Sequence, residues 1–258
     1  MSGQETGNIY SVFWLYRAAP EWRRLPAAER DAGLDAFAGA LEGGLEGLTL
    51  RGAYSMVGLR HDADLMLWLH GPDLGQAQDL AVALRRTPLG GYLDEVYIYT
   101  GLVPRSRYAP EHRPAFTKGA APGTYLSIYP FVKTPEWYLI PFEQRRALMA
   151  EHGKMGQAHS AMPEIRIDTG AGSGHHGGTA VAEAPAVTPV GTVLANTIHS
   201  FGLGDQEFVV AFESEDPAAL EKMVEDLRAA EVRRYTAIDT PVFLGRRKAI
   251  RAALADLG

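Results

Sequence analysis

The sequence predicts an α+β fold made of two ferredoxin-like β-α-β-β-α-β units, a duplication that would form a dimeric α+β barrel-like subunit. Strand-like and helix-like patterns follow one another in the same order in both halves of the chain. In addition, "GLRHDADLMLWLHGPD", which starts at Gly58, parallels "GLGDQEFVVAFESEDP", which starts at Gly202. Each unit is expected to be an antiparallel sheet with its helices on one face.

The individual elements follow from apolar periodicity and from the turn residues between them. In the first half the pattern predicts strands at 9–17, 48–59, 63–71 and 92–103 and helices at 27–44 and 73–87. In the second half it predicts strands at 124–133, 191–204, 206–214 and 239–245 and helices at 141–155 and 216–231. A Pro/Gly/Ala-rich connection at 103–123 separates the halves. We therefore expect a scaffold half at 1–110 and a site-bearing half at 111–258.

The helix predicted at 141–155 carries a histidine on its apolar side. Pro141 suits a first helical turn, and Gly153 suits a helix end. Leu148, Met149 and His152 have the i, i+1, i+4 spacing of a buried stripe, so the imidazole is expected to point inward from the last turn. Taken alone, such a histidine is more often a hydrogen-bonded core residue than a ligand.

A Gly-, Ala- and Pro-rich stretch near 160–192 interrupts the second half and has almost no periodicity. Its composition predicts a long flexible insert between a helix and a strand. His175 and His176 lie within it, but the glycines around them argue against a rigid metal site.

Composition excludes several classes of function. The net charge of −6 argues against a nucleic-acid partner. No apolar run approaches the roughly 20 residues that a membrane span needs, and the start "MSGQETGNIY" lacks the features of a signal peptide. The absence of cysteine excludes disulfides, iron–sulfur clusters and a thiolate-ligated haem. A cytoplasmic protein is the expectation.

One cluster in the second half combines imidazoles, a phenol and several cations. Each member has an ordinary structural explanation, such as a solvated strand end or cations that suit the C-terminus of a helix. Together, a buried histidine facing cations and a tyrosine indicates a pocket for a large flat anion whose metal takes one imidazole. The members are His112, Tyr129, Lys133, His152, Arg228, Arg233 and Arg234.

These residues lie in motifs that resemble those of the coproheme decarboxylases of actinobacterial type, within the chlorite-dismutase-like superfamily. The motifs are "HRPAF", "YPFVKTPEWYLIP", "LMAEHGKMG", "ANTIHSFGLGDQEFVVAFE" and "LRAAEVRRY". The spacing also matches, because His112 lies 17 residues before Tyr129 and His152 lies 23 residues after it. The resemblance covers nearly the whole chain except the insert.

The resemblance implies a role for each matching residue. His152 would be the proximal ligand of the iron, and Tyr129 would be the redox-active residue that forms a radical. His112 would be the distal base that takes a proton from hydrogen peroxide. Lys133 and Arg233 would bind propionate carboxylates. Lys133 stands where the relatives carry arginine, so the bidentate fork of a guanidinium is lost there.

Trp137 and Ala195 would also contact the porphyrin. Ala195 occupies the position of the distal arginine of chlorite dismutases, which favours decarboxylation over chlorite chemistry. Phe208 replaces a common tryptophan. His199, which could also approach a haem face, is better explained as a strand residue.

The implied activity is hydrogen-peroxide-dependent oxidative decarboxylation of Fe-coproporphyrin III (coproheme) to haem b. The iron porphyrin would be both substrate and cofactor. The resemblance further implies a homopentamer, and it makes coproporphyrin ferrochelatase a candidate partner. Two alternatives stay open, namely a chlorite dismutase or peroxidase-like haem enzyme and a haem-binding carrier without catalysis.

Overall fold

The computed structural model describes residues 8–103, 113–161 and 191–258. The chain divides into two compact units. Unit 1 takes its described residues from 1–104, 198–205 and 243–258, and unit 2 takes them from 105–197 and 206–242. The proposed division into 1–110 and 111–258 stays a prediction, because 104–112 lie outside the described residues.

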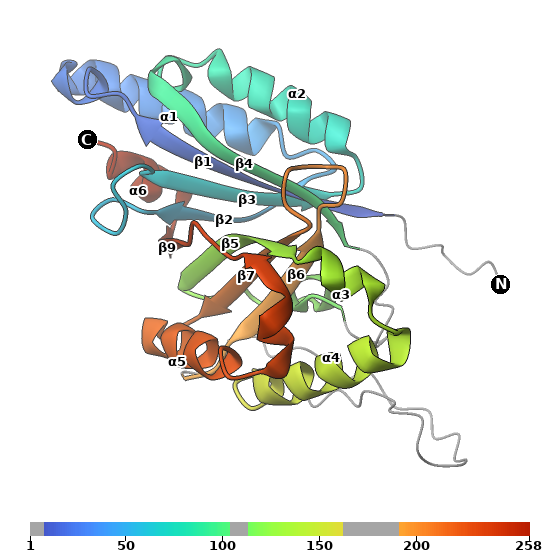
Figure 1. Ribbon diagram of the computed structural model, residues 1–258. Coiled ribbons are helices and arrows are strands. Elements are labelled where there is room, and N and C mark those ends of the chain that lie inside the picture. Colours follow the sequence, from blue (N-terminus) through green and yellow to red (C-terminus); the bar gives the residue numbers. More distant parts are fainter. Residues whose placement is uncertain (1–7, 104–112, 162–190) are drawn as a thin grey trace. The chain divides into compact units, whose positions relative to one another are not determined.

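Unit 1 holds an antiparallel sheet in the order β4-β1-β3-β2-β9. Figure 1 shows α1 and α2 side by side along one face of β1, β3 and β4. The elements are β1 (Ile9–Ala18), η1 (Trp22–Arg24), α1 (Ala27–Gly43), β2 (Thr49–Ser55), β3 (Leu65–Gly71), α2 (Leu74–Arg85), η2 (Gly90–Tyr92), β4 (Leu93–Val103), β9 (Phe243–Lys248) and α6 (Ile250–Ala255).

Three large side chains of α1 enter the core of unit 1. Leu34, Phe37 and Leu41 recur at helical spacing and are almost fully buried in one apolar cluster, which also contains Trp22. Gly33 sits inside the same helix because a Cβ there would lie 2.8 Å from the Trp22 ring. The close approach of indole and helix backbone therefore compensates for the low helix propensity of glycine.

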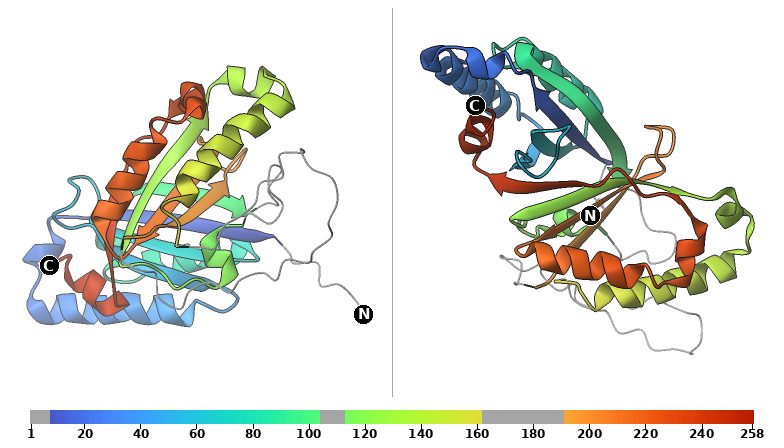
Figure 2. Two further views of the ribbon diagram at one scale, coloured as in Figure 1. Left: turned by 90° about the horizontal axis from the view of Figure 1, so that it is seen from below. Right: turned by 60° about the vertical axis from the view of Figure 1, so that its left-hand side comes forward.

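Unit 2 repeats the topology of unit 1. Its strands follow the order β8-β5-β7-β6, which corresponds element by element to β4-β1-β3-β2. Figure 2 shows α4 and α5 next to each other on one side of these strands. The elements are η3 (Ala115–Lys118), β5 (Tyr125–Lys133), α3 (Pro135–Leu139), α4 (Phe142–Gln157), β6 (Leu194–His199), β7 (Phe208–Ser214), α5 (Pro217–Leu227), η4 (Glu231–Tyr235) and β8 (Thr236–Ile238). The last two residues of β6 belong to unit 1.

This repeated order confirms the predicted duplicated ferredoxin-like fold, but the strand predicted at 239–245 is wrong as the closing strand. That strand is the shorter β8, whose Ile238 and Thr236 pair with Val132 and Lys133 of β5. Pro241 interrupts the predicted run, since proline has no N–H to donate to a ladder. The following residues form β9, which pairs with β2 in unit 1.

The predicted end of the helix that carries His152 is also wrong. Pro141 does precede the first helical residue, but α4 runs through Gly153 to Gln157. Met155, beyond the glycine, packs against the apolar cluster of Trp137, Ala230 and Val232. This packing offsets the roughly 1 kcal/mol that a glycine costs inside a helix. His152 therefore lies more than a turn before the helix end.

Candidate functional site

The centre of the candidate site is the face of β5 that carries Tyr129, Phe131 and Lys133. These residues are two apart, so the pleat directs all three side chains to the same side of the strand. Tyr129 is half-buried and meets Phe212 edge to face, with 6.1 Å between ring centroids. Tyr129 pairs with Val210 of β7, which holds this part of β5 in register.

Lys133 is a buried cation held against aromatic rings. Its Nζ lies 5.0 Å from the ring centroid of Phe131 and 4.5 Å from that of Trp137. Its backbone N–H donates to Oε2 of Glu207 at 2.7 Å, which anchors the end of β5. Burial lowers the pKa of Lys133 to about 8, while Glu207 raises it and Arg233 lowers it. A buried ammonium of this kind would bind the carboxylate of a ligand favourably.

His152 projects from α4 toward the same region. Leu148 and Met149 of its helix pack against the cluster around Trp137, but the predicted stripe is only partly buried, since none of the residues of α4 is fully buried. The Nδ1 atom of His152 is enclosed and has no hydrogen-bond partner among the described residues. Burial, followed by the charge of Lys133, lowers the pKa of His152 to about 4. The imidazole is therefore neutral near pH 7, as a metal ligand must be.

This shifted pKa makes the apo-protein sensitive to acid. The unfolded chain takes up the proton of His152 near pH 6.5 and the folded chain only near pH 4, so stability falls as pH falls between these values. Between pH 7 and pH 5 we expect a loss of about 2 kcal/mol in the free energy of unfolding. Urea denaturation of wild type and His152→Leu at both pH values checks this. The loss should be smaller by that amount in the variant, and an equal loss in both proteins would contradict the prediction.

Two arginines share one carboxylate just after β8, the strand that pairs with the end of β5. Nη1 of Arg233 lies 2.8 Å from Oδ2 of Asp239, and Nη1 of Arg228 donates to the same oxygen. Burial raises the pKa of Tyr129 well above its usual value. The charges of Arg228 and Arg233 lower this pKa, and that of Asp239 raises it. The phenol is thus protonated, and the two arginines that act on its pKa carry the charge needed to attract a carboxylate.

The structure brings five of the seven residues named as site residues into one region of unit 2. They are linked by ring contacts or by their effects on one another's pKa, and they are Tyr129, Lys133, Trp137, His152 and Arg233. Ala195 is half-buried on β6, where its methyl group can contribute only space. His112 and residues 162–190 of the insert predicted near 160–192, which include its two histidines, lie outside the described residues.

Sequence reasoning missed Asp239 and gave Arg228 no role of its own. Asp239 stands before a Thr-Pro pair, which is typical of a turn. Arg228 is the C-cap residue of α5, where a cation needs no further explanation. Only the folded chain shows that Arg228 and Arg233 both meet Asp239.

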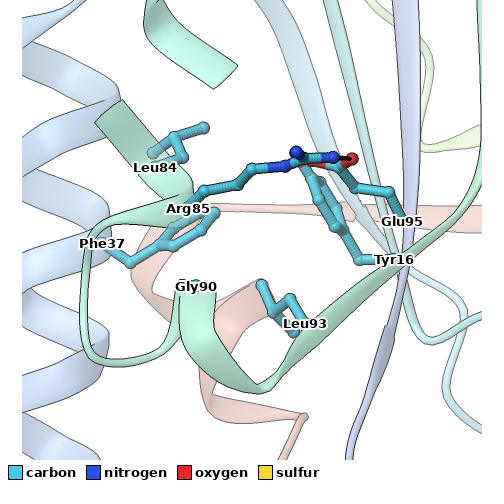
Figure 3. Close-up of a pocket in the computed structure, with 7 residues that line it drawn as sticks. All are labelled: Tyr16, Phe37, Leu84, Arg85, Gly90, Leu93 and Glu95. Atoms are coloured by element: carbon cyan, nitrogen blue, oxygen red, sulfur yellow. Dashed lines mark hydrogen bonds and ion pairs between the residues drawn. The ribbon is translucent and has the colours of Figure 1, made fainter. Parts of the chain in front are cut away.

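A hollow in unit 1 offers no comparable site. Tyr16 is buried there beneath an ion pair in which Nε of Arg85 lies 2.8 Å from Oε1 of Glu95 (Figure 3). The side chains fill the hollow and leave a volume of about 0 Å³ for water. The pair therefore caps a buried tyrosine instead of opening a cavity.

Comparison with known families now adds to this geometry. Residues 17–174 and 184–248 match the family described as chlorite dismutase. The chain belongs to the chlorite dismutase family.

Among curated members related to this one, the coproheme decarboxylase of Mycolicibacterium smegmatis is 33% identical over 213 residues, which are 82% of this chain and 79% of the relative. The coproheme decarboxylase of Thermus thermophilus is 26% identical over 217 residues, 79% of this chain and 74% of the relative. The chlorite dismutase of Candidatus Nitrospira defluvii, solved in complex with imidazole, superposes with a TM-score of 0.77 at 22% identity, covering 96% of this chain and 94% of that one. This last likeness supports the fold alone.

The residues of this family member fit an iron porphyrin. An enclosed, neutral imidazole supplies a nitrogen donor, and the cations around β5 supply partners for carboxylates.

In the part of the chain that the structure describes, none of the helices has the length and apolar character needed to cross a membrane.

Proposed function

We propose that this chain catalyses the hydrogen-peroxide-dependent oxidative decarboxylation of Fe-coproporphyrin III to haem b. The observation that carries the proposal is the placement of Tyr129. Its protonated phenol shares one face of β5 with the buried cation Lys133 and lies within the field of Arg228 and Arg233. A group that can lose one electron and one proton thus sits where a carboxylate would bind. The relatives named coproheme decarboxylase support the same assignment.

The overall chemistry limits what the residues must do. Each propionate becomes a vinyl group by losing CO₂, two electrons and one proton. One hydrogen peroxide accepts these two electrons, that proton and one more proton from the solvent, and becomes two water molecules. When bound, the iron porphyrin supplies this redox chemistry with peroxide, and the protein supplies binding, orientation and proton transfer.

Each side chain in the site has a task in this proposal. His152 offers its neutral imidazole to the iron, and the apolar cluster beside Leu148 and Met149 keeps the ring in place. Lys133 and Arg233 bind propionate carboxylates through charge-assisted hydrogen bonds. Tyr129 gives up an electron and its phenolic proton next to the bound carboxylate. His112, known here from sequence only, is proposed to accept the first proton of peroxide.

The direct test is to add ferric coproporphyrin III to the purified apo-protein, titrate with hydrogen peroxide and follow the porphyrin mass. Successive loss of two carboxyl groups is the expected result. Binding with an unchanged mass would contradict the proposal, and evolution of oxygen from chlorite by the same sample would favour a chlorite dismutase instead. Ala195 argues against that outcome, because a methyl group cannot hold an anion.

A cytoplasmic location, a homopentamer and docking of coproporphyrin ferrochelatase are finer proposals that come from the resemblance alone. Size measurement in solution and pull-down with the purified ferrochelatase would test the last two.

The shifted pKa of Lys133 predicts how porphyrin binding depends on pH. Below about pH 8 its ammonium is charged and attracts a carboxylate, and above that value the attraction is lost. Arg233 stays charged throughout, and His152 stays neutral across this range. The affinity for metal-free coproporphyrin III should therefore fall severalfold, up to about tenfold, between pH 7 and pH 9.

Two variants of Lys133 separate this effect from others. Lys133→Arg should remove the fall, because a guanidinium stays charged. Lys133→Met should bind about tenfold more weakly at pH 7 and show no further loss. Fluorescence titration at several pH values measures both. A wild-type-like pH dependence in Lys133→Met would show that another group is responsible.

A further inference from the structure

One carboxylate oxygen gathers two arginines in unit 2. Oδ2 of Asp239 accepts from Nη1 of Arg233 at 2.8 Å and from Nη1 of Arg228. The three residues come from separate elements. Arg228 caps the end of α5, Arg233 lies in η4, and Asp239 directly follows β8. The carboxylate thereby ties together the end of α5, η4 and the residue that follows β8.

This arrangement leaves hydrogen-bond donors of both arginines available to a ligand. Two guanidinium groups that converge on one oxygen repel each other, and only the shared anion keeps them close. The side chain of Asp239 is 16% exposed, whereas those of Arg228 and Arg233 are 44% and 37% exposed. The carboxylate of Asp239 is therefore the more buried group, and the two guanidinium groups are the more exposed ones. Each guanidinium has five N–H donors, so donors remain for an incoming carboxylate.

The trio also lies next to the strand that carries the reactive side chain. The short strand β8 stands between Arg233 and Asp239 in the chain and pairs with Val132 and Lys133 of β5. The charges of the trio also act on the pKa of Tyr129, which agrees with this placement. By contrast, the nearby pair Glu231 and Arg234 is exposed, with Nε of Arg234 3.1 Å from Oε2 of Glu231.

We propose that Asp239 is a positioning residue that holds Arg228 and Arg233 together beside Tyr129, so that their outward donors bind the propionate carboxylate to be removed. This inference rests on the proposed function. We call Arg228, Arg233 and Asp239 the carboxylate clamp. The carboxylate of Asp239 fixes the positions of the two guanidinium groups and reduces their combined charge from +2 to +1. Specificity for a porphyrin with carboxylates at the reacting positions follows from the clamp.

The test measures binding by fluorescence titration and does not depend on turnover. The probes are metal-free coproporphyrin III, which has carboxylates at the reacting positions, and metal-free protoporphyrin IX, which lacks them. Asp239→Asn should weaken coproporphyrin binding about tenfold, although it makes the site more positive. Binding of protoporphyrin should change less than about threefold. Asp239→Glu should restore most of the affinity, and Glu231→Gln should behave as wild type.

Several results would overturn the clamp. Unchanged or tighter coproporphyrin binding by Asp239→Asn would mean that Asp239 only balances charge. Equal weakening for both porphyrins would mean a general structural role, which melting temperatures would also reveal. The proposed function fails separately: a wild-type protein that shows the expected binding pattern but leaves coproheme intact with peroxide would keep the clamp and lose the decarboxylase.

Discussion

Replacing Tyr129 with phenylalanine is expected to stop decarboxylation while coproheme remains bound. Phenylalanine keeps the ring that meets Phe212 but has no O–H to oxidise. If the phenol is the group that removes the electron and the proton next to the carboxylate, the adjacent residues on this face, Ser127, Phe131 and Lys133, have no phenol to replace it. The rate of propionate loss should fall at least about 1000-fold, which corresponds to more than about 4 kcal/mol in the barrier.

The measurement is the mass of the porphyrin after a fixed exposure to hydrogen peroxide, together with the affinity for ferric coproporphyrin III. Affinity should stay within about threefold of wild type, because Lys133 and the arginine pair are untouched. Tyr125→Phe is the matched control. Tyr125 lies on the same strand, where it pairs with Ser214, and it should retain full activity.

The same variant separates the proposed enzyme from a carrier. A haem-binding carrier would bind coproheme equally well with or without the Tyr129 hydroxyl and would leave its mass unchanged in both proteins. Decarboxylation at the wild-type rate by Tyr129→Phe would show that the oxidising step passes through another residue. In that case the position of Tyr129 among cations would serve binding only.

The fold was accessible from sequence because the two units bury similar apolar patterns. The runs that became β3 and β7 are almost fully buried, so their hydrophobic character is clear without a structure. Element ends were less accessible. Gly153 is a common helix stop, but Met155 finds a place in the apolar cluster and prolongs α4. Tertiary packing decided that boundary, and packing partners are not visible in a local pattern.

The candidate site was accessible only in part, for a related reason. Tyr129 and Lys133 belong to one strand, so the two-residue period predicts that they share a face. The meeting of Asp239 with Arg228 and Arg233 depends on how α5, η4 and β8 follow one another in space. Local sequence gives each an ordinary explanation, as a turn residue or a helix-end cation. No periodicity joins a turn carboxylate to a helix cap.

Replacing His152 with alanine is the second change expected to have a large effect. The imidazole is enclosed at Nδ1, is neutral at pH 7 and packs beside an apolar cluster, so no described group competes with iron for it. Alanine should leave the carboxylate partners intact and remove the nitrogen donor. The absorption spectrum of ferric coproporphyrin III bound to the variant should therefore differ from wild type, and decarboxylation should fall about 100-fold or more.

Binding of metal-free coproporphyrin III distinguishes the loss of an iron ligand from a loss of folded protein. This porphyrin has no iron to ligate, so His152→Ala and wild type should bind it with affinities within about threefold of each other. Added imidazole should enter the space left by the side chain and partly restore the wild-type spectrum and activity. His159→Asn is the matched control. Nε2 of His159 lies 2.9 Å from Oδ2 of Asp226 on α5, so this histidine is engaged elsewhere. The variant should therefore leave the spectrum unchanged.

A wild-type spectrum in His152→Ala would assign the iron to a different ligand and would return His152 to the more common role of a buried core histidine. The structure argues against that role. A core histidine ordinarily satisfies its buried nitrogen with a hydrogen bond, and an enclosed polar atom without one costs about 1–3 kcal/mol. Nδ1 of His152 has no partner among the described residues, and Lys133 nearby adds a charge that makes protonation still less favourable. The unpaired nitrogen and the charge of Lys133 both fit an imidazole on α4 that is kept neutral to bind a metal.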